Sequence, residues 1–145
     1  MKFGVPDLKT LSKAVRESDP LEDIPLSYLL HHRQPAFWWI LDEIAMDPRC
    51  MEAHRFCTRF CALAFIYAEQ AAGYSLPSYP EHIIRNMAGF MVRGEEAQIG
   101  KRACGFPKRI FRHVLRNSEF DEEDTEWLCT TISAFLFVVE RSVRA

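Results

Sequence analysis

The sequence lacks an excess of charge of one sign, and it has no long hydrophobic run. Eighteen lysines and arginines stand against twenty aspartates and glutamates, a formal net charge of −2. No global electrostatic field therefore attracts a nucleic acid or an anionic membrane. The longest uninterrupted apolar run, Phe60–Ala68, is far shorter than the roughly 20 residues of a membrane span. We expect no transmembrane helix.

The number and spacing of the cysteines do not suit a set of disulfide bonds. There are five, and three of them, Cys50, Cys57 and Cys61, lie at helical spacing in one segment. Two cysteines on one straight helix cannot reach disulfide geometry. Reduced thiols that pack as small hydrophobic side chains are typical of a reducing compartment. The sequence therefore predicts a cytoplasmic protein.

Strand patterns are also missing, because no segment alternates apolar and polar residues between turn signals. Apolar residues make up 48% of the chain and recur every three or four positions, which indicates helices with a shared core. We predict an all-α fold, a single-domain helical bundle of five to seven helices over residues 1–145. Two long central helices are expected at about 48–72 and 121–144, with residues 1–34 as a candidate peripheral helical arm.

Proline and glycine mark the expected helix ends. Pro25 is expected to break an early helix, and Pro35 to occupy the first turn of the next one. Gly73 is well placed to end the 48–72 helix in the left-handed conformation. Ser78 and Glu81 have the spacing of a capping box, which predicts the start of a further helix.

The sharpest chemical pattern is a stripe of soft metal ligands, Cys50, His54, Cys57 and Cys61. At 100° per residue these four positions fall within about 60° of one another on a helix. Cys50 and Cys61 would nevertheless lie roughly 16 Å apart along the axis, too far to share one ion. We therefore predict that these side chains pack in the core. A metal or cofactor site is the weaker alternative, and no cofactor is expected.

Cys104 differs from the other thiols because it follows Lys101 and Arg102. Neighbouring cations lower a thiol pKa and favour the reactive thiolate. Cys104 is therefore the candidate reactive thiol, with packing under the bundle as the alternative.

Charge is more informative locally than globally. Residues 101–116 contain six cations and no acid, and a helix there would present Lys108, Arg109, Arg112 and Arg116 on one face. Such a face can follow a phosphate backbone. Six acids follow in residues 119–126 and oppose that interpretation, so a solvated face or a protein-binding face remains open.

Large aromatic residues crowd the segment Phe37–Ile40. Four large apolar residues in a row cover more than half of a helix circumference, so one of them is expected to stay exposed. Trp38 and Trp39 are therefore candidate partner-binding residues, since aromatic side chains are favoured at interface centres.

No nucleophile elbow, phosphate loop or paired metal-ligand motif is present in the sequence. The preferred hypothesis is a small cytoplasmic protein-interaction or regulatory module that works without catalytic chemistry, through a protein partner or self-association. Nucleic-acid binding through residues 101–116 is the alternative. A thiol-based redox or cofactor-binding protein is the second alternative.

Overall fold

The computed structural model describes residues 13–14, 17, 21, 23–44, 51–92 and 122–144. Five helices have their bounds within these residues: α2 (Asp23–Arg33), α3 (Pro35–Ile44), α4 (Met51–Ala72), α5 (Glu81–Val92) and α7 (Glu122–Arg144). The described part of the chain contains no strand. The prediction of an all-α helical bundle is confirmed.

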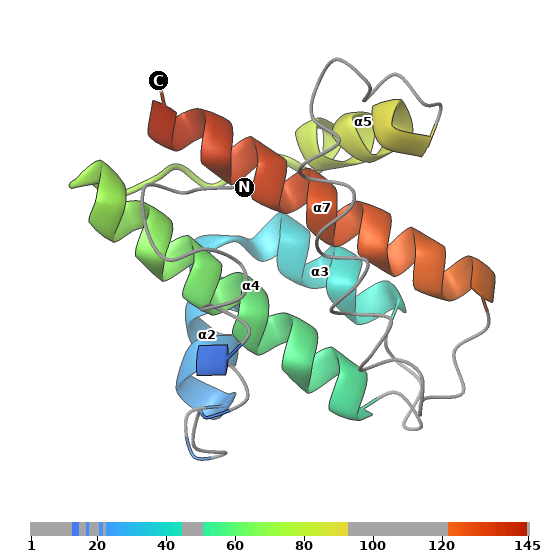
Figure 1. The fold of residues 1–145 in the computed structure, drawn as a ribbon, viewed down its shortest axis with the longest axis horizontal. Coiled ribbons are helices and arrows are strands. Elements are labelled where there is room, and N and C mark those ends of the chain that lie inside the picture. Colours follow the sequence, from blue (N-terminus) through green and yellow to red (C-terminus); the bar gives the residue numbers. More distant parts are fainter. Residues whose placement is uncertain are drawn as a thin grey trace.

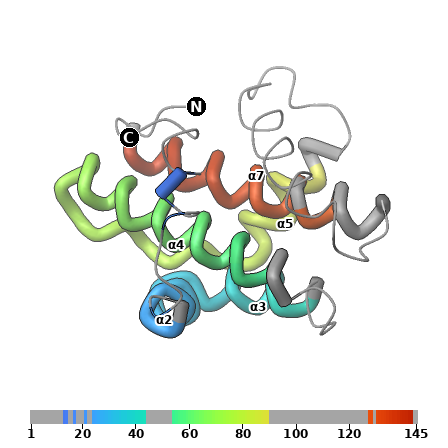
Figure 2. The backbone as a smooth tube through the Cα atoms, turned by 60° about the horizontal axis from the view of Figure 1, so that its bottom comes forward, coloured from blue at the N-terminus to red at the C-terminus, as the bar shows by residue number. Residues whose placement is uncertain are grey.

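The two long helices, α4 and α7, form the centre of the bundle. They lie side by side and run in the same direction across the molecule (Figures 1 and 2). The shorter helices pack around this pair: α2 contacts α4, α5 contacts α7, and α3 contacts both α7 and α5. The α2 and α3 helices also contact each other, so together they form one side of the bundle.

A single large cluster of buried side chains joins all five helices. The α4 helix contributes most to it, because it carries apolar residues around most of its circumference. Phe60, Cys61, Phe65 and Ala68 of this helix are fully buried, as expected for a helix surrounded by others. On the α3 side, Phe37 packs against Phe135 of α7. Side-chain burial of this kind is the main stabilising term for the bundle.

Of the predicted helix-end signals, Gly73 behaves as predicted and Pro25 does not. Gly73 has a φ of 77°, and its N–H donates to the Glu69 carbonyl at 2.9 Å, so it ends α4 as predicted. Pro25 does not break a helix. It is the third residue of α2, within the first turn, where a missing N–H has no intrahelical acceptor to lose.

Among the described helices, none combines the length and the apolar character that crossing a bilayer requires.

Candidate interaction surface at the corner between α2 and α3

A single non-helical residue, Gln34, separates α2 from α3. Its N–H donates to the Leu30 carbonyl at 2.8 Å, which completes the last turn of α2, and its own carbonyl accepts from Trp38 N–H at 2.9 Å. Pro35 follows, and a proline has no N–H with which to continue α2. The backbone therefore turns a tight corner in which both neighbouring helices keep their terminal hydrogen bonds.

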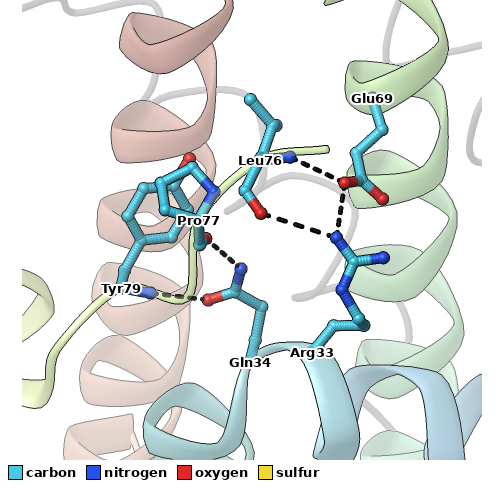
Figure 3. Close-up of polar contacts among 6 residues, drawn as sticks. All are labelled: Arg33, Gln34, Glu69, Leu76, Pro77 and Tyr79. Atoms are coloured by element: carbon cyan, nitrogen blue, oxygen red, sulfur yellow. Dashed lines mark hydrogen bonds and ion pairs between the residues drawn. The ribbon is translucent and has the colours of Figure 1, made fainter. Parts of the chain in front are cut away.

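The Gln34 side chain holds this corner against the segment that follows α4. It is fully buried, and its amide nitrogen donates to the Pro77 carbonyl at 2.8 Å. Its amide oxygen accepts from the Tyr79 N–H at 3.0 Å. Figure 3 shows the amide reaching two backbone groups on either side of Ser78. A buried amide with both ends bonded fixes the local geometry, because breaking either bond leaves a desolvated polar group.

Arg33 makes a second anchor beside the first. Its guanidinium donates to a carboxylate oxygen of Glu69 at 2.6 Å, and the same oxygen accepts from the Leu76 N–H at 2.7 Å. The guanidinium also lies 5.2 Å from the centre of the Phe65 ring, within the range of a cation–π contact. The corner is therefore tied to α4 and to residues 76–79 by side chains from two consecutive positions (Figure 3).

The outer side of the corner is apolar and exposed. Ile24 is 82% exposed, Tyr28 67% and Trp39 58%. Ile24 and Tyr28 lie four residues apart, on one face of α2, and Leu21, just before the helix, is 83% exposed. We call this set the corner surface: Leu21, Ile24, Tyr28, His31, His32 and Trp39.

Two histidines join the aromatic members of the corner surface. The His32 ring stacks on Tyr28 with centroids 5.8 Å apart. The His31 ring lies 5.5 Å from Trp38 and meets the edge of Trp39 at 6.0 Å. His31 thus links the C-terminal end of α2 to α3 through ring contacts.

The two predicted tryptophans lie in different environments. Trp39 is exposed because it lies about 200° around the helix from the buried Phe37. Trp38 is half-buried, and its ring meets His54 of α4 edge-on at 5.7 Å. Of these two tryptophans, only Trp39 is largely exposed to solvent.

His54 is itself largely buried between α3 and α4. Its Nε2 lies 3.9 Å from a carboxylate oxygen of Asp42, and no hydrogen-bond partner for Nε2 occurs among the described residues. Burial lowers the pKa of His54, and the nearby Asp42 opposes this shift. The histidine is therefore held largely neutral at the α3–α4 interface.

The thiol stripe of α4 has no metal-site geometry in the described part of the chain. Cys57 and Cys61 are buried thiols, and burial raises the pKa of Cys61 well above its ordinary value. Over residues 13–14, 17, 21, 23–44, 51–92 and 122–144, no three His, Cys, Asp or Glu side chains gather where they would hold a metal ion. Cys50 lies outside those residues, so the full four-ligand stripe stays a prediction.

The other predicted site residues also lie outside the described part of the chain. They are Cys104, the candidate reactive thiol, and the basic residues Lys108, Arg109, Arg112 and Arg116. A reactive thiol and a nucleic-acid-binding segment therefore stay predictions.

Sequence reasoning missed the contribution of α2 to the corner surface. A signal was present, since the segment DIPLSYLLHHR carries apolar residues on two opposite faces. Leu26 and Leu30 fill the core, which leaves Ile24 and Tyr28 in excess of what one buried face needs.

Comparisons of this chain with protein-family models, with curated proteins and with solved structures gave no match.

Proposed function

We propose that this chain is a protein-interaction module that acts through surface complementarity, without catalytic chemistry of its own. The observation that carries the proposal is the exposure of Ile24 and Tyr28 on one face of α2 and of Trp39 on α3, with the His31 ring in contact with Trp39. With Leu21, these residues together leave on the order of 500 Å² of their surface in water. Large exposed apolar residues that gather at one place are typical of binding surfaces.

The composition of the corner surface fits the proposal. Tyrosine and tryptophan are enriched among the residues that dominate binding energy, and charged residues are depleted from interface centres. From Ile24 to His32 the sequence contains no Lys, Arg, Asp or Glu. A partner therefore removes water from this surface without separating formal charges from their hydration.

The rigid backing of the corner supports the proposal further. Gln34 and Arg33 fix the turn between the helices through bonds to residues 69–79. A surface that is already ordered before binding loses little conformational entropy on association. The corner surface is in this sense prepared for a partner.

The proposed compartment is the cytoplasm. Cys57 and Cys61 are thiols buried in one helix, four residues apart, an arrangement that suits a reducing environment. A redox-sensitive fluorescent fusion that reports an oxidising compartment contradicts this assignment.

The proposal is tested by site-specific photocrosslinking of the full chain in its native cells. A photoreactive phenylalanine derivative replaces Tyr28 in one variant and Ile83 in a matched control. Ile83 is also an exposed apolar residue, at 39%, but it lies on α5, away from the corner surface. We expect a discrete protein adduct from position 28, lost when Trp39→Glu is added, and none from position 83.

Two outcomes contradict the proposal. One is the absence of any protein adduct at position 28. The other is an adduct that Trp39→Glu leaves unchanged, because a partner seated on the corner surface must lose contact when its exposed indole becomes a carboxylate.

A further inference from the structure

The corner surface has an internal order along α2. Ile24, Tyr28 and His32 follow one another at four-residue intervals and share a helix face. Tyr28 lies at the midpoint of α2 (Asp23–Arg33). The aliphatic side chains Leu21 and Ile24 lie toward the N-terminal end, and the aromatic contact of His31 with Trp39 lies at the other end. The surface thus has an aliphatic half and an aromatic half on either side of one tyrosine.

We propose, resting on the function proposed above, that the partner on the corner surface is a second copy of this chain. The two copies pair through their α2 helices, antiparallel, about a two-fold axis that passes beside Tyr28. A two-fold interface brings the same surface of both copies together. It lays the aliphatic half of one copy on the aromatic half of the other, with the two Tyr28 side chains opposite each other.

The ends of α2 favour the antiparallel orientation. The helix begins at Asp23 and has His31, His32 and Arg33 in its last turn. Antiparallel pairing brings the N-terminal end of one α2 beside the C-terminal end of the other, whereas parallel pairing would bring like ends together; Arg33 itself stays paired with Glu69 of its own copy. The helix dipoles are then also opposed, which is their favourable side-by-side arrangement.

The exposed area matches what such a pair needs. A standard interface buries about 800 Å² on each partner, of which about 65% is apolar at homodimer contacts. That share is on the order of 500 Å², the same size as the apolar area that Leu21, Ile24, Tyr28 and Trp39 leave exposed.

Sedimentation equilibrium of the purified full chain tests the inference. The wild-type chain is compared with Tyr28→Glu, with Tyr28→Lys, and with an equimolar mixture of the two variants. Ile83→Glu is the matched control, because it places the same charge on an exposed apolar position of α5. Tyr28 is 67% exposed, so these substitutions leave the core intact, and circular dichroism checks that each variant is folded.

We expect the wild type and Ile83→Glu to dimerise in the micromolar range. Each Tyr28 variant alone is expected to dimerise at least about tenfold more weakly, because like charges then meet at the axis. The mixture is expected to recover dimers, since a lysine of one chain then meets a glutamate of the other. This recovery is specific to an arrangement in which position 28 of one copy faces position 28 of the other.

Three results would overturn the inference. They are a wild type that stays monomeric up to about 200 µM, Tyr28 variants that dimerise as tightly as the wild type, and a mixture that recovers no dimer. If the wild type is monomeric and position 28 crosslinks to a different protein, the inference that the partner is a second copy is wrong. The proposed function then still holds. Loss of every adduct at position 28 removes both.

Discussion

The rings of Phe37 and Phe135 stack face to face at the centre of the bundle, with centroids 3.9 Å apart and planes within 5° of parallel. This contact joins α3 to α7 and is fully buried on both sides. Because α3 carries both this ring and the exposed Trp39, one short helix has a buried face and an exposed face. The first prediction separates them.

We expect Phe37→Ala to lower the free energy of unfolding by about 3–5 kcal/mol, because it removes a stacked ring and leaves a cavity. Trp39→Ala, on the opposite face of the same helix, is expected to cost less than about 1 kcal/mol. Urea unfolding of both variants measures the difference. Equal losses would show that the assignment of faces in α3 is wrong.

Gln34→Met tests the corner. The substitution keeps a similar volume but leaves the Pro77 carbonyl and the Tyr79 N–H buried without their partner. We expect a loss of about 2–4 kcal/mol, together with faster hydrogen exchange at the Tyr79 amide. The control Gln70→Met, at an exposed position of α4, should stay within about 0.5 kcal/mol. An unchanged exchange rate at Tyr79 would contradict the anchoring role.

His54 predicts a pH dependence of stability. Burial lowers its pKa in the folded state below the ordinary 6.5, so the unfolded chain takes up the proton first as the pH falls. The contribution of neutral His54 to the free energy of unfolding is therefore complete above pH 6.5. It is lost as the pH falls from 6.5 through the pKa of His54 in the folded protein. We expect His54→Phe to flatten this part of the stability curve relative to the wild type.

The matched control for that measurement is His82→Gln, since His82 is exposed at the start of α5. Chemical denaturation between about pH 5 and 8 compares the three proteins. If the wild type and His54→Phe share the same slope, His54 is not held neutral at the α3–α4 interface.

Thiol reactivity distinguishes the cysteines. Burial raises the pKa of Cys61, and the thiolate is the reactive form. We expect Cys57 and Cys61 to resist alkylation at neutral pH until the protein is unfolded in urea, as read by mass spectrometry of peptides. The same experiment tests the prediction for Cys104, which should react first. Rapid alkylation of Cys61 in the folded protein would contradict its burial.

The basic segment 101–116 has its own test. If it binds a nucleic acid, the affinity for labelled DNA or RNA must fall steeply with salt and fall further in the triple variant Arg109→Ala, Arg112→Ala, Arg116→Ala. Fluorescence anisotropy at low and moderate salt measures both effects. Absence of binding at low salt ends this alternative.

Much of the fold was predictable because it depends on local signals. Pro35 and Gly73 mark helix ends through their own backbone chemistry, and the apolar spacing of α4 and α7 is legible without any partner. The beginning of α5 was predicted two residues too early. Tyr79 does not join the helix; it precedes Pro80, and a residue before a proline is biased away from the helical conformation, so α5 begins at Glu81.

The candidate site was less predictable, because it depends on residues far apart in the sequence. Arg33 and Glu69 are 36 positions apart, and no local pattern pairs them. The sequence did indicate that one aromatic residue of Phe37–Ile40 would be exposed. Trp39 is the exposed residue because α3 is rotated so that Phe37 faces α7. Ile24 and Tyr28 are exposed because Leu26 and Leu30 are the residues of α2 that pack in the core.

The anchors at the corner bind mostly main-chain atoms: the Leu76 N–H, the Pro77 carbonyl and the Tyr79 N–H. Main-chain atoms are present whatever side chains the segment carries. These hydrogen bonds therefore hold the path of residues 76–79 without specifying their side chains; within this segment, Leu76 and Tyr79 are constrained instead by their burial in the core. We expect a distant relative to keep an arginine–glutamine pair before a proline, as in Arg33, Gln34 and Pro35, together with a glutamate near the end of the long helix, as in Glu69. The side chains of the loop that these residues hold are expected to be less similar.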